Sequence, residues 1–468
     1  MRPVPRLLFL IILIEGYVVL ASELLAIRQL IPFVGSGTET VAILVSAVLL
    51  PLAIGYHQGG RAPVHIRRRL IRNLLIALGY LTLALSYPVL ELFFTLLDRA
   101  GLHHPIAQTA CYALLLLIVP IYLLGQTVPL ISNYFHRQRI SELTGRMLFF
   151  STVGSFLGSV FSTLVLMNTI GVHATVSATL ALLVLLVAVL ARRMPGAAGM
   201  GALCILLLTL LLNSPATLRA FRIVSDNSYN TVSVHATPKG GRLLRINRSP
   251  SSALTKEGVS AFPYITYIES TFIDPLAAAK GRPGAVLVIG AGGFTLGLKD
   301  TTNRFTFVDI DPALKRVAEQ HFLSAPLGHN KTFIAQSARA FVRRERARYD
   351  LIFIDTFTNV FSAPMETITQ EFLADAKKLL AADGILIVNQ IARPDLSDRF
   401  SLRYDRTFAR VFGAYTRQII GDYNPWAPDT TTAALRNILY IYYARADAVD
   451  PTYYSDDLNS YSLDRAHH

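Results

Sequence analysis

Cysteine and charge are both scarce in this chain, and each scarcity excludes a class of protein. Only two cysteines occur among 468 residues, Cys111 and Cys204, and both lie inside apolar runs. This placement excludes a disulfide framework, and no zinc-type spacing or other metal site is evident. Charged residues make up 16% of the chain, whereas soluble domains have about 25%. The sequence therefore does not describe a uniformly soluble globule.

Long apolar runs fill the first half of the chain. A helix that crosses a bilayer needs about 20 mostly apolar residues. Candidate spans occupy residues 7–31, 39–58, 70–96, 106–133, 146–168, 172–191 and 197–213. The first run contains Glu15 and Glu23 and lacks a small-residue cleavage site, so we expect a retained helix rather than a signal peptide. The sequence predicts a bundle of about seven membrane-spanning helices over residues 1–214.

Two features inside this bundle stand out. Glu23 is an acid at membrane depth, and it either pairs with Arg28 near the helix end or faces a polar cavity. Gly154 and Gly158 form a GxxxG pair, which allows two helix backbones to approach closely. We interpret the glycine pair as ordinary helix packing rather than as a substrate path.

The net charge of +13 does not indicate a nucleic-acid partner. No basic stripe with interleaved aromatic residues occurs, and no nucleic-acid-binding motif is present. Basic loops are expected beside anionic lipid and on the cytoplasmic side of a membrane protein. The charge therefore fits a lipid bilayer as the partner.

The second half of the chain alternates between strands and helices. We expect a small β-hairpin layer and a lead-in helix at 258–280 within residues 215–284, then a Rossmann-like domain over 285–445 and a polar tail over 446–468. The domain's predicted strands are 285–290, 304–309, 331–335, 350–355 and 384–390. Helices are predicted between them at 312–322, 337–346 and 369–381. This alternation predicts a parallel sheet with helices on both faces.

A glycine turn follows the first of these strands. Gly290, Gly292 and Gly293 would let a ligand approach the backbone closely. Asp309 ends the second strand, where its carboxylate can accept hydrogen bonds from the hydroxyls of a ribose. Asp355 ends the fourth strand, and ligands bind at the carboxyl ends of parallel strands. The pattern predicts a nucleoside site.

Five motifs in this half resemble the spermidine synthase (polyamine aminopropyltransferase) family. In order they are Asp226-Asn-Ser-Tyr-Asn-Thr-Val-Ser-Val234, Tyr267-Ile-Glu269, Val286 to Gly293, Val308-Asp-Ile-Asp-Pro312 and Tyr349 to Asp355. The resemblance covers roughly residues 225–445, and the apolar first half resembles the family's membrane-anchored bacterial branch. It implies an α/β class I methyltransferase-type fold behind a multi-pass helical domain.

The resemblance also implies a function and a site. The expected reaction moves an aminopropyl group from decarboxylated S-adenosylmethionine to an amine, in a bacterial-type inner membrane, with a homodimer formed through the soluble domain. Asp355 is the expected catalytic residue. The residues expected to bind the cofactor are Gly290, Gly292, Gly293, Asp309, Gln336 and Ser337. The residues expected to bind the substrate are Tyr267, Glu269, Thr358 and Tyr423.

The chain departs from the family at several acidic positions. Gly293 and Thr358 stand where the family has aspartates, and Ile268 replaces a histidine. A diamine is a dication, and burying a charge without a partner costs several kcal/mol. Two alternatives therefore remain open. The first is an S-adenosylmethionine-dependent methyltransferase that acts on a membrane-borne acceptor, and the second is a catalytically degenerate scaffold or transport protein.

The side of the membrane is the last question that the sequence raises. The basic loops Arg61–Arg72, His136–Arg146 and Arg192–Arg193 fall on one side, with the N-terminus, if all seven spans cross. The positive-inside rule makes that side cytoplasmic, which would place the α/β domain outside. Adenosyl ligands are cytoplasmic, so we expect instead that the span at 197–213 is miscounted and that the domain is cytoplasmic.

Overall fold

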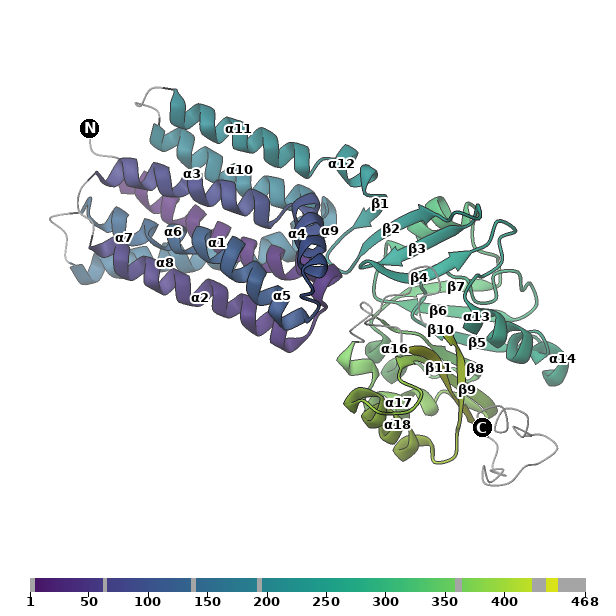
Figure 1. The fold of residues 1–468 in the computed structure, drawn as a ribbon. Coiled ribbons are helices and arrows are strands. Elements are labelled where there is room, and N and C mark those ends of the chain that lie inside the picture. The colour runs from purple at the N-terminus through teal and green to yellow at the C-terminus, as the bar shows by residue number, and fades with distance from the viewer. Residues whose placement is uncertain are drawn as a thin grey trace. The chain divides into compact units, whose positions relative to one another are not determined.

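The computed structural model describes residues 5–61, 65–135, 140–191, 196–357, 364–422 and 435–444. The chain divides into two compact units, Met1–Val232 and Ser233–His468, and Figure 1 shows a helical first unit and an α/β second unit. The boundary at residue 214, which the sequence predicts from the end of the apolar runs, stays a prediction.

The first unit is built from helices. They are α1 (Pro5–Val34), α2 (Thr38–Gly60), α3 (Ile66–Ala84), α4 (Tyr87–Arg99), α5 (Pro105–Tyr112), a π-helical turn (Ala113–Leu117), α6 (Ile118–Gly125), α7 (Thr127–Ser132), α8 (Ile140–Val160), a second π-helical turn (Phe161–Leu166), α9 (Met167–Thr169), α10 (Val172–Ala191), α11 (Ala197–Leu212) and α12 (Pro215–Ala220). The short helices α5, α6 and α7 follow one another in a single apolar run, Pro105–Ser132.

Six helical runs among the described residues are long and apolar enough to cross a membrane. They are Arg6–Val34, Thr38–Gly60, Pro105–Ser132, Ser141–Thr169, Val172–Ala191 and Ala197–Ala220. Helices α3 and α4 are long and apolar enough to cross a membrane only when they are taken together. Their axes are bent by 68° relative to each other, and the number of candidate spans rises to seven if this pair is one span. The apolar run expected at 70–96 is therefore two helices.

The break between α3 and α4 has a local cause. Ser86 Oγ donates to the carbonyl of Thr82, four residues earlier, and such back-bonding competes with the helix ladder. Pro88 lies in the first turn of α4, where a missing backbone N–H costs nothing. Leu90 and Phe94 of α4 are buried, whereas Leu92 and Leu96 are exposed.

Glycines allow helices α1 and α8 to cross with their backbones close together. A Cβ on Gly154 would lie 2.0 Å from the carbonyl oxygen of Leu13, and one on Gly158 would lie 2.3 Å from that of Tyr17. On α1, a Cβ on Gly16 would lie 2.3 Å from the carbonyl oxygen of Ser151. Only residues without a side chain allow backbones this close, so the GxxxG pair packs two helices together.

A small four-stranded sheet, in which β3 and β4 pair antiparallel, precedes the main α/β fold. Its strands are β1 (Ile223–Asp226), β2 (Thr231–Ala236), β3 (Arg242–Ile246) and β4 (Ser249–Leu254), in that order. The lead-in helix expected at 258–280 is wrong in its first turns, because α13 (Pro263–Ile268) begins only at Pro263. Ser260 is still paired with Leu254 in an isolated β-bridge. A π-helical turn (Glu269–Ile273) and α14 (Leu276–Lys280) follow.

The main sheet has seven strands. In chain order its elements are β5 (Ala285–Ile289), β6 (Arg304–Asp309), α15 (Leu314–Val317), a π-helical turn (Ala318–Leu323), β7 (Lys331–Ala335), α16 (Ala338–Arg344), β8 (Tyr349–Ile354), a 3₁₀ turn (Met365–Thr367), α17 (Gln370–Lys377), β9 (Leu380–Ala392), α18 (Arg399–Phe412), β10 (Thr416–Asp422) and β11 (Arg436–Tyr443). The strand order is β10-β11-β9-β8-β5-β6-β7.

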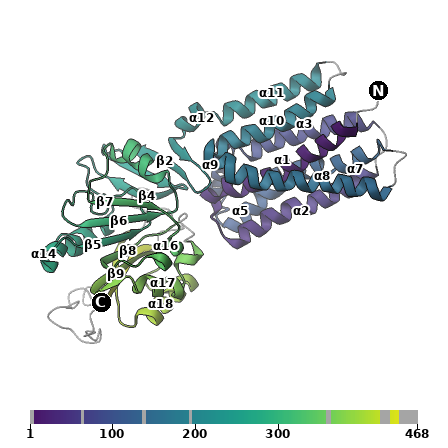
Figure 2. The same ribbon diagram turned by 180° about the vertical axis from the view of Figure 1, so that it is seen from behind.

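The sheet is mixed rather than wholly parallel. Strands β7, β6, β5, β8 and β9 run parallel, as the sequence predicts. Strands β10 and β11 add an antiparallel edge that the sequence analysis missed. Helices α16, α17 and α18 lie together beside the sheet in Figure 2 and share one buried core with its strands. The fold is a class I methyltransferase-type Rossmann fold, as expected.

Candidate functional site

The glycine turn after β5 is held against the end of β8. Gly290 has a φ of +92°, and a Cβ there would lie 2.1 Å from the carbonyl oxygen of Asp355. The backbone N–H of Asp355 donates to the carbonyl of Ile289 at 2.8 Å. Only glycine satisfies both the positive φ and the contact. The turn therefore brings the ends of two neighbouring parallel strands together.

Asp309 ties the glycine turn to the next strand. Its Oδ2 accepts a hydrogen bond from the backbone N–H of Ala291 at 3.0 Å, and its Oδ1 accepts one from the N–H of Asp311 at 3.1 Å. Burial raises the pKa of Asp309 to about 6, although these two backbone donors act in the opposite direction. Each carboxylate oxygen keeps a further lone pair for a ligand hydroxyl. Asp311 instead accepts from the N–H of Ala313 and caps the following turn.

Asp355 is held by two side chains that the sequence analysis did not identify. The Tyr264 hydroxyl donates to its Oδ2 at 2.9 Å, and Asn389 Nδ2 donates to its Oδ1 at 3.0 Å. Burial raises the pKa of Asp355 to about 6, and both donors oppose that rise. Tyr264 comes from α13 and Asn389 from β9, so two elements besides β8, which Asp355 follows, position one carboxylate.

Asn389 leaves one polar atom without a partner. Its side chain is 2% exposed, and its Nδ2 also contacts Asn437 Oδ1 at 3.2 Å. Its Oδ1 is buried and has no hydrogen-bond partner among the described residues. A buried carbonyl oxygen without a donor costs free energy, and a water or a ligand can supply the missing donor.

Gly293, where the family has an acid, leaves no room for a side chain. A Cβ at this position would lie 2.5 Å from Phe322 Cε1 and 2.8 Å from Ser252 Cβ. The Gly293 backbone N–H donates to Ser252 Oγ at 2.8 Å. The space that a side chain at this position would need is therefore filled by Phe322 and Ser252. Ser252, from β4, also accepts the hydrogen bond of the Gly293 backbone N–H. Sequence reasoning found the loss of the acid but missed both partners.

The remaining expected cofactor-binding residues lie beside Asp309. Gln336 donates its backbone N–H to the carbonyl of Asp309 at 2.8 Å, and Ser337 follows at the start of α16. Because β6 and β7 are parallel neighbours, both residues lie at the sheet edge that carries Asp309. Two expected substrate-binding residues, Thr358 and Tyr423, lie outside the described residues.

Tyr267 lies one turn after Tyr264 on α13, and Glu269 begins the π-helical turn that follows. Glu269 Oε1 accepts from the Gly297 N–H at 2.8 Å and lines a pocket of about 430 Å³ with Asp274 and Asp300. Burial raises the pKa of Glu269, and the two neighbouring aspartates raise it further. The Tyr267 ring packs edge-on against Phe272. Among the described residues no hydrogen bond or ion pair joins Glu269 to Asp355.

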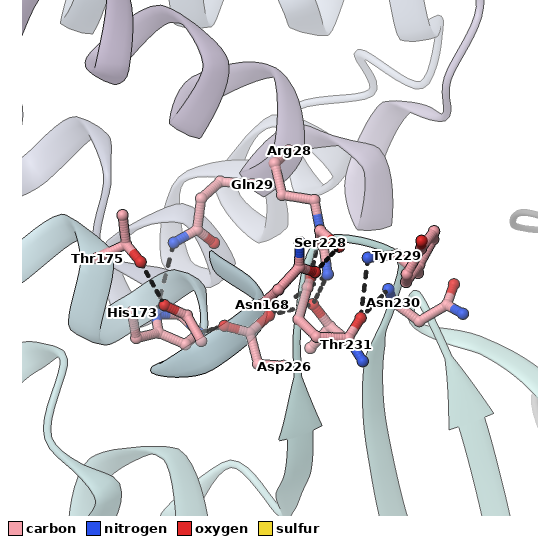
Figure 3. A network of polar contacts seen from close by, with 12 residues as sticks. Arg28, Gln29, Asn168, His173, Thr175, Asp226, Ser228, Tyr229, Asn230 and Thr231 are labelled. Carbon is pink, nitrogen blue, oxygen red and sulfur yellow. Dashed lines mark hydrogen bonds and ion pairs between the residues drawn. The ribbon is translucent and has the colours of Figure 1, made fainter. Parts of the chain in front are cut away.

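Arg28 of the helical unit pairs with a partner that the sequence analysis did not foresee. Its guanidinium donates to Asp226 Oδ1 at 3.4 Å and to the carbonyl of Asn227 at 2.8 Å. His173 Nε2 lies 3.2 Å from Asp226 Oδ2, and Figure 3 shows these side chains converging. Within the described part of the chain, no hydrogen bond or ion pair joins Arg28 to Glu23, which is 8% exposed.

The described residues contain no cluster of three or more histidine, cysteine, aspartate or glutamate side chains that could hold a metal ion. The site's polar groups are carboxylates, hydroxyls and amides, which suit an organic ligand with hydrogen-bond donors. The acid at the end of β8, the acid at the end of β6 and the glycine turn between them form one candidate site.

Comparison with curated proteins finds one that is similar to part of this chain. A polyamine aminopropyltransferase of Vibrio vulnificus (strain CMCP6) is 30% identical over 156 residues, which cover 32% of this chain and 51% of that protein. The chain thus spans about half the length of that curated relative. No family model matches the chain.

Several solved structures are similar to part of this chain at low sequence identity. A probable spermidine synthase from Corynebacterium glutamicum ATCC 13032 is 21% identical, covers 49% of this chain and 83% of its own, and has a TM-score of 0.39. Spermidine synthase from Thermotoga maritima is 15% identical over 51% of this chain and 82% of its own, with a TM-score of 0.37. Human methyltransferase-like protein 13, in complex with SAH, is 18% identical over 44% of this chain and 87% of its own, with a TM-score of 0.33.

The curated relative and the five motifs point to the same group. Over about a third of its length, the chain therefore resembles a polyamine aminopropyltransferase.

Proposed function

We propose that this protein is a membrane-bound, spermidine-synthase-like transferase that moves an aminopropyl group from decarboxylated S-adenosylmethionine to an amine. The observation that carries the proposal is the buried Asp355, held by Tyr264 and Asn389 next to the glycine turn. Six apolar helical runs among the described residues are long enough to cross a membrane, and they support the membrane-bound part of the proposal. A bacterial inner membrane and a homodimer through the α/β unit stay predictions.

The residues present fit an adenosyl co-substrate. Asp309 has lone pairs left for ribose hydroxyls, and Gly290 keeps the turn free of side chains where a nucleoside would approach. Gln336 and Ser337 lie at the same edge for the base. When bound, the co-substrate supplies an electrophilic carbon next to a sulfonium leaving group. The helix that often follows such a turn is missing between β5 and β6 of the described chain, so no helix N-terminus faces a phosphate there.

Asp355 is the group suited to accept a proton from the amine substrate. An amine must be neutral to attack carbon, and a carboxylate with a pKa of about 6 is mostly ionised at neutral pH. It can therefore accept a proton from the amine and aim its lone pair. Tyr264 and Asn389 fix the carboxylate in one orientation, while the orphan Asn389 Oδ1 offers an acceptor for a second amine N–H.

Ligand binding by the full-length protein in detergent tests this proposal. Decarboxylated S-adenosylmethionine, S-adenosylmethionine and methylthioadenosine are titrated calorimetrically against the wild type and Asp309→Ala. We expect decarboxylated S-adenosylmethionine to bind, and Asp309→Ala to weaken it at least tenfold. Asp300→Ala, which changes an acid of the Glu269 pocket, is the matched control and should bind normally. Preference for intact S-adenosylmethionine would replace aminopropyl transfer by methyl transfer to a membrane-borne acceptor.

A second candidate, a catalytically degenerate scaffold or transport protein, is favoured by the direction of the helices. Arg67 at the start of α3 donates to the carbonyl of Leu190 at the end of α10. Arg69 contacts Gln126, which precedes α7. The basic N-terminal end of α3 therefore shares one end of the bundle with the C-terminal ends of α6 and α10.

The chain leaves the helical unit at the other end. Asn213, which follows α11, donates to Ser86 Oγ after α3, and Arg28 near the end of α1 donates to the carbonyl of Asn227. Helix α3 thus runs between the two ends. If the basic end is cytoplasmic, then residues 213–232 lie across the membrane, away from adenosyl ligands. This geometry does not support a miscount at 197–213, since α11 is a full helix.

Reporter fusions to the C-terminus of the full chain decide between the two candidates. Green fluorescent protein folds in the cytoplasm, whereas alkaline phosphatase becomes active only outside it. Fluorescence without phosphatase activity would support the transferase. Phosphatase activity without fluorescence would contradict a cytoplasmic transferase and leave the scaffold or transport role.

A further inference from the structure

Helix α1 carries a polar stripe through the helical unit. Glu15, Ser22 and Gln29 are spaced seven residues apart, which places them on one face of a helix at intervals of about 10 Å. Their exposed fractions are 1%, 0% and 3%. Such residues are costly inside a membrane bundle, and they usually mark a functional path.

Glu15 is the most unusual member of this stripe. Neither of its carboxylate oxygens has a hydrogen-bond partner among the described residues, although both are buried. An ionised carboxylate without a partner in an apolar interior is strongly disfavoured. The side chain must therefore carry a proton in this state of the protein.

The surroundings of Glu15 are tightly packed and contain few polar groups. Its neighbour Gly16 lies against the backbone of Ser151 on α8. Helix α2 brings the side chain of Tyr56 near both Glu15 and Ser151. Helix α8 also carries Arg146, whose guanidinium lies 4.8 Å from the centroid of the Phe9 ring on α1. No described basic side chain forms an ion pair with Glu15.

The far end of the stripe reaches titratable groups. Gln29 Nε2 lies 3.4 Å from His173 Nδ1, and His173 Nε2 lies 3.2 Å from Asp226 Oδ2. Figure 3 shows Gln29, His173 and Asp226 in this arrangement. Between the two ends, Ser22 Oγ on α1 and Thr179 Oγ1 on α10 are buried without hydrogen-bond partners among the described residues. Unsatisfied hydroxyls are what a chain of transient waters would need.

We propose that Glu15 is a proton-binding site of the helical unit, which exchanges its proton along the stripe through Ser22 and Gln29 towards His173 and Asp226. The ligand is a proton, and the acceptor is the carboxylate of Glu15. This site is separate from the nucleoside site and does not depend on the transferase proposal. It gives the helical unit a role of its own in proton movement.

A hydrophobic carbodiimide tests the proposal on the full-length protein in detergent. A protonated acid adds its O–H across one C=N bond of the reagent, and the acyl group then moves to nitrogen as a stable N-acylurea, so that nothing leaves. We expect peptide mass spectrometry to find the adduct on Glu15, with a yield that falls as pH rises. Glu39, an exposed acid at the start of α2, is the internal control and should stay unmodified.

Variants and a second measurement keep the outcome clear. Glu15→Gln keeps the shape of the side chain and should abolish the adduct at that peptide, while Glu23→Gln should leave it. Infrared difference spectra between high and low pH should show a protonated-carboxyl band that Glu15→Gln removes. An unmodified Glu15 in the wild type, together with an unchanged infrared band in Glu15→Gln, would overturn the proposal. Protection of Glu15 by sodium ions at constant pH would also overturn it, because the ligand would then be a cation rather than a proton.

Discussion

Phe322 occupies the space that any side chain at Gly293 would need. A Cβ on Gly293 would lie 2.5 Å from Phe322 Cε1, and Phe322 is fully buried. The chain resembles a family with an aspartate at this position, and here the Phe322 ring fills the space that such a side chain would take. Restoring the acid alone cannot restore its function, because the site for it has been filled.

Substitutions at this contact should therefore be coupled. Gly293→Ala forces a methyl group into a packed core and should destabilise the protein by about 1–3 kcal/mol. Phe322→Leu should also destabilise it, because it leaves a cavity. The double variant should be more stable than the sum of the two changes predicts, as measured by thermal unfolding of the full-length protein in detergent. Strict additivity would show that the ring and the glycine do not compete for one space.

Changing Asp355 to asparagine should separate catalysis from folding. The Tyr264 hydroxyl can reverse its hydrogen bond towards the new amide, and Asn389 can still donate to the remaining oxygen. We expect transfer activity to fall by about 10²–10⁴-fold, with little change in the binding of the adenosyl ligand. Tyr264→Phe should cost less, since Asn389 still orients the acid. Full activity in Asp355→Asn would remove this residue from the mechanism.

The two buried aspartates predict how stability depends on pH. The pKa values of Asp309 and Asp355 are both raised to about 6, so the folded state binds protons more tightly than the unfolded chain. Stability should therefore fall as pH rises from about 4 to about 6 and then level off, by at most about 3 kcal/mol per group. Asp355→Asn should flatten part of this slope. A wild type that becomes more stable across this range, with the same slope in the variant, would contradict the assignment.

The ion pair of Arg28 with Asp226 should stabilise the folded helical unit. Both side chains are about 6% exposed, and removing one partner leaves a buried charge uncompensated. Arg28→Ala should destabilise the protein by about 3–5 kcal/mol. Arg99→Ala, an exposed arginine at the end of α4, is the control and should change stability little. If both variants lower the thermal unfolding midpoint equally, the ion pair of Arg28 with Asp226 does not stabilise the protein.

Helix α8 offers a matched pair of glycines for testing the crossing with α1. Gly154→Ala should disrupt that crossing, because its methyl group would lie 2.0 Å from the carbonyl oxygen of Leu13. Gly145→Ala on the same helix meets nothing within 4 Å and should be neutral or slightly stabilising. The thermal unfolding midpoints of the two variants check this. If Gly154→Ala lowers the unfolding midpoint less than Gly145→Ala does, helices α1 and α8 do not approach each other as closely as described.

The sequence alone determined the fold class and the edge of the sheet that carries the site. Apolar runs of about 20 residues and the alternation of strands and helices are local patterns, and local patterns can be read without contacts. The same reasoning placed Asp309 and Asp355 at strand ends and found the glycine turn between them. Gly154 and Gly158 likewise signalled a close helix crossing, although not which helix would be met.

The tertiary structure decided which side chains surround those positions. Tyr264 and Asn389 reach Asp355 from elements distant in sequence, Phe322 fills the space above Gly293, and Arg28 pairs with a residue 198 positions away. The antiparallel strands β10 and β11 were missed for the same reason. Pairings between distant segments depend on how whole elements pack, and no spacing along the chain encodes them.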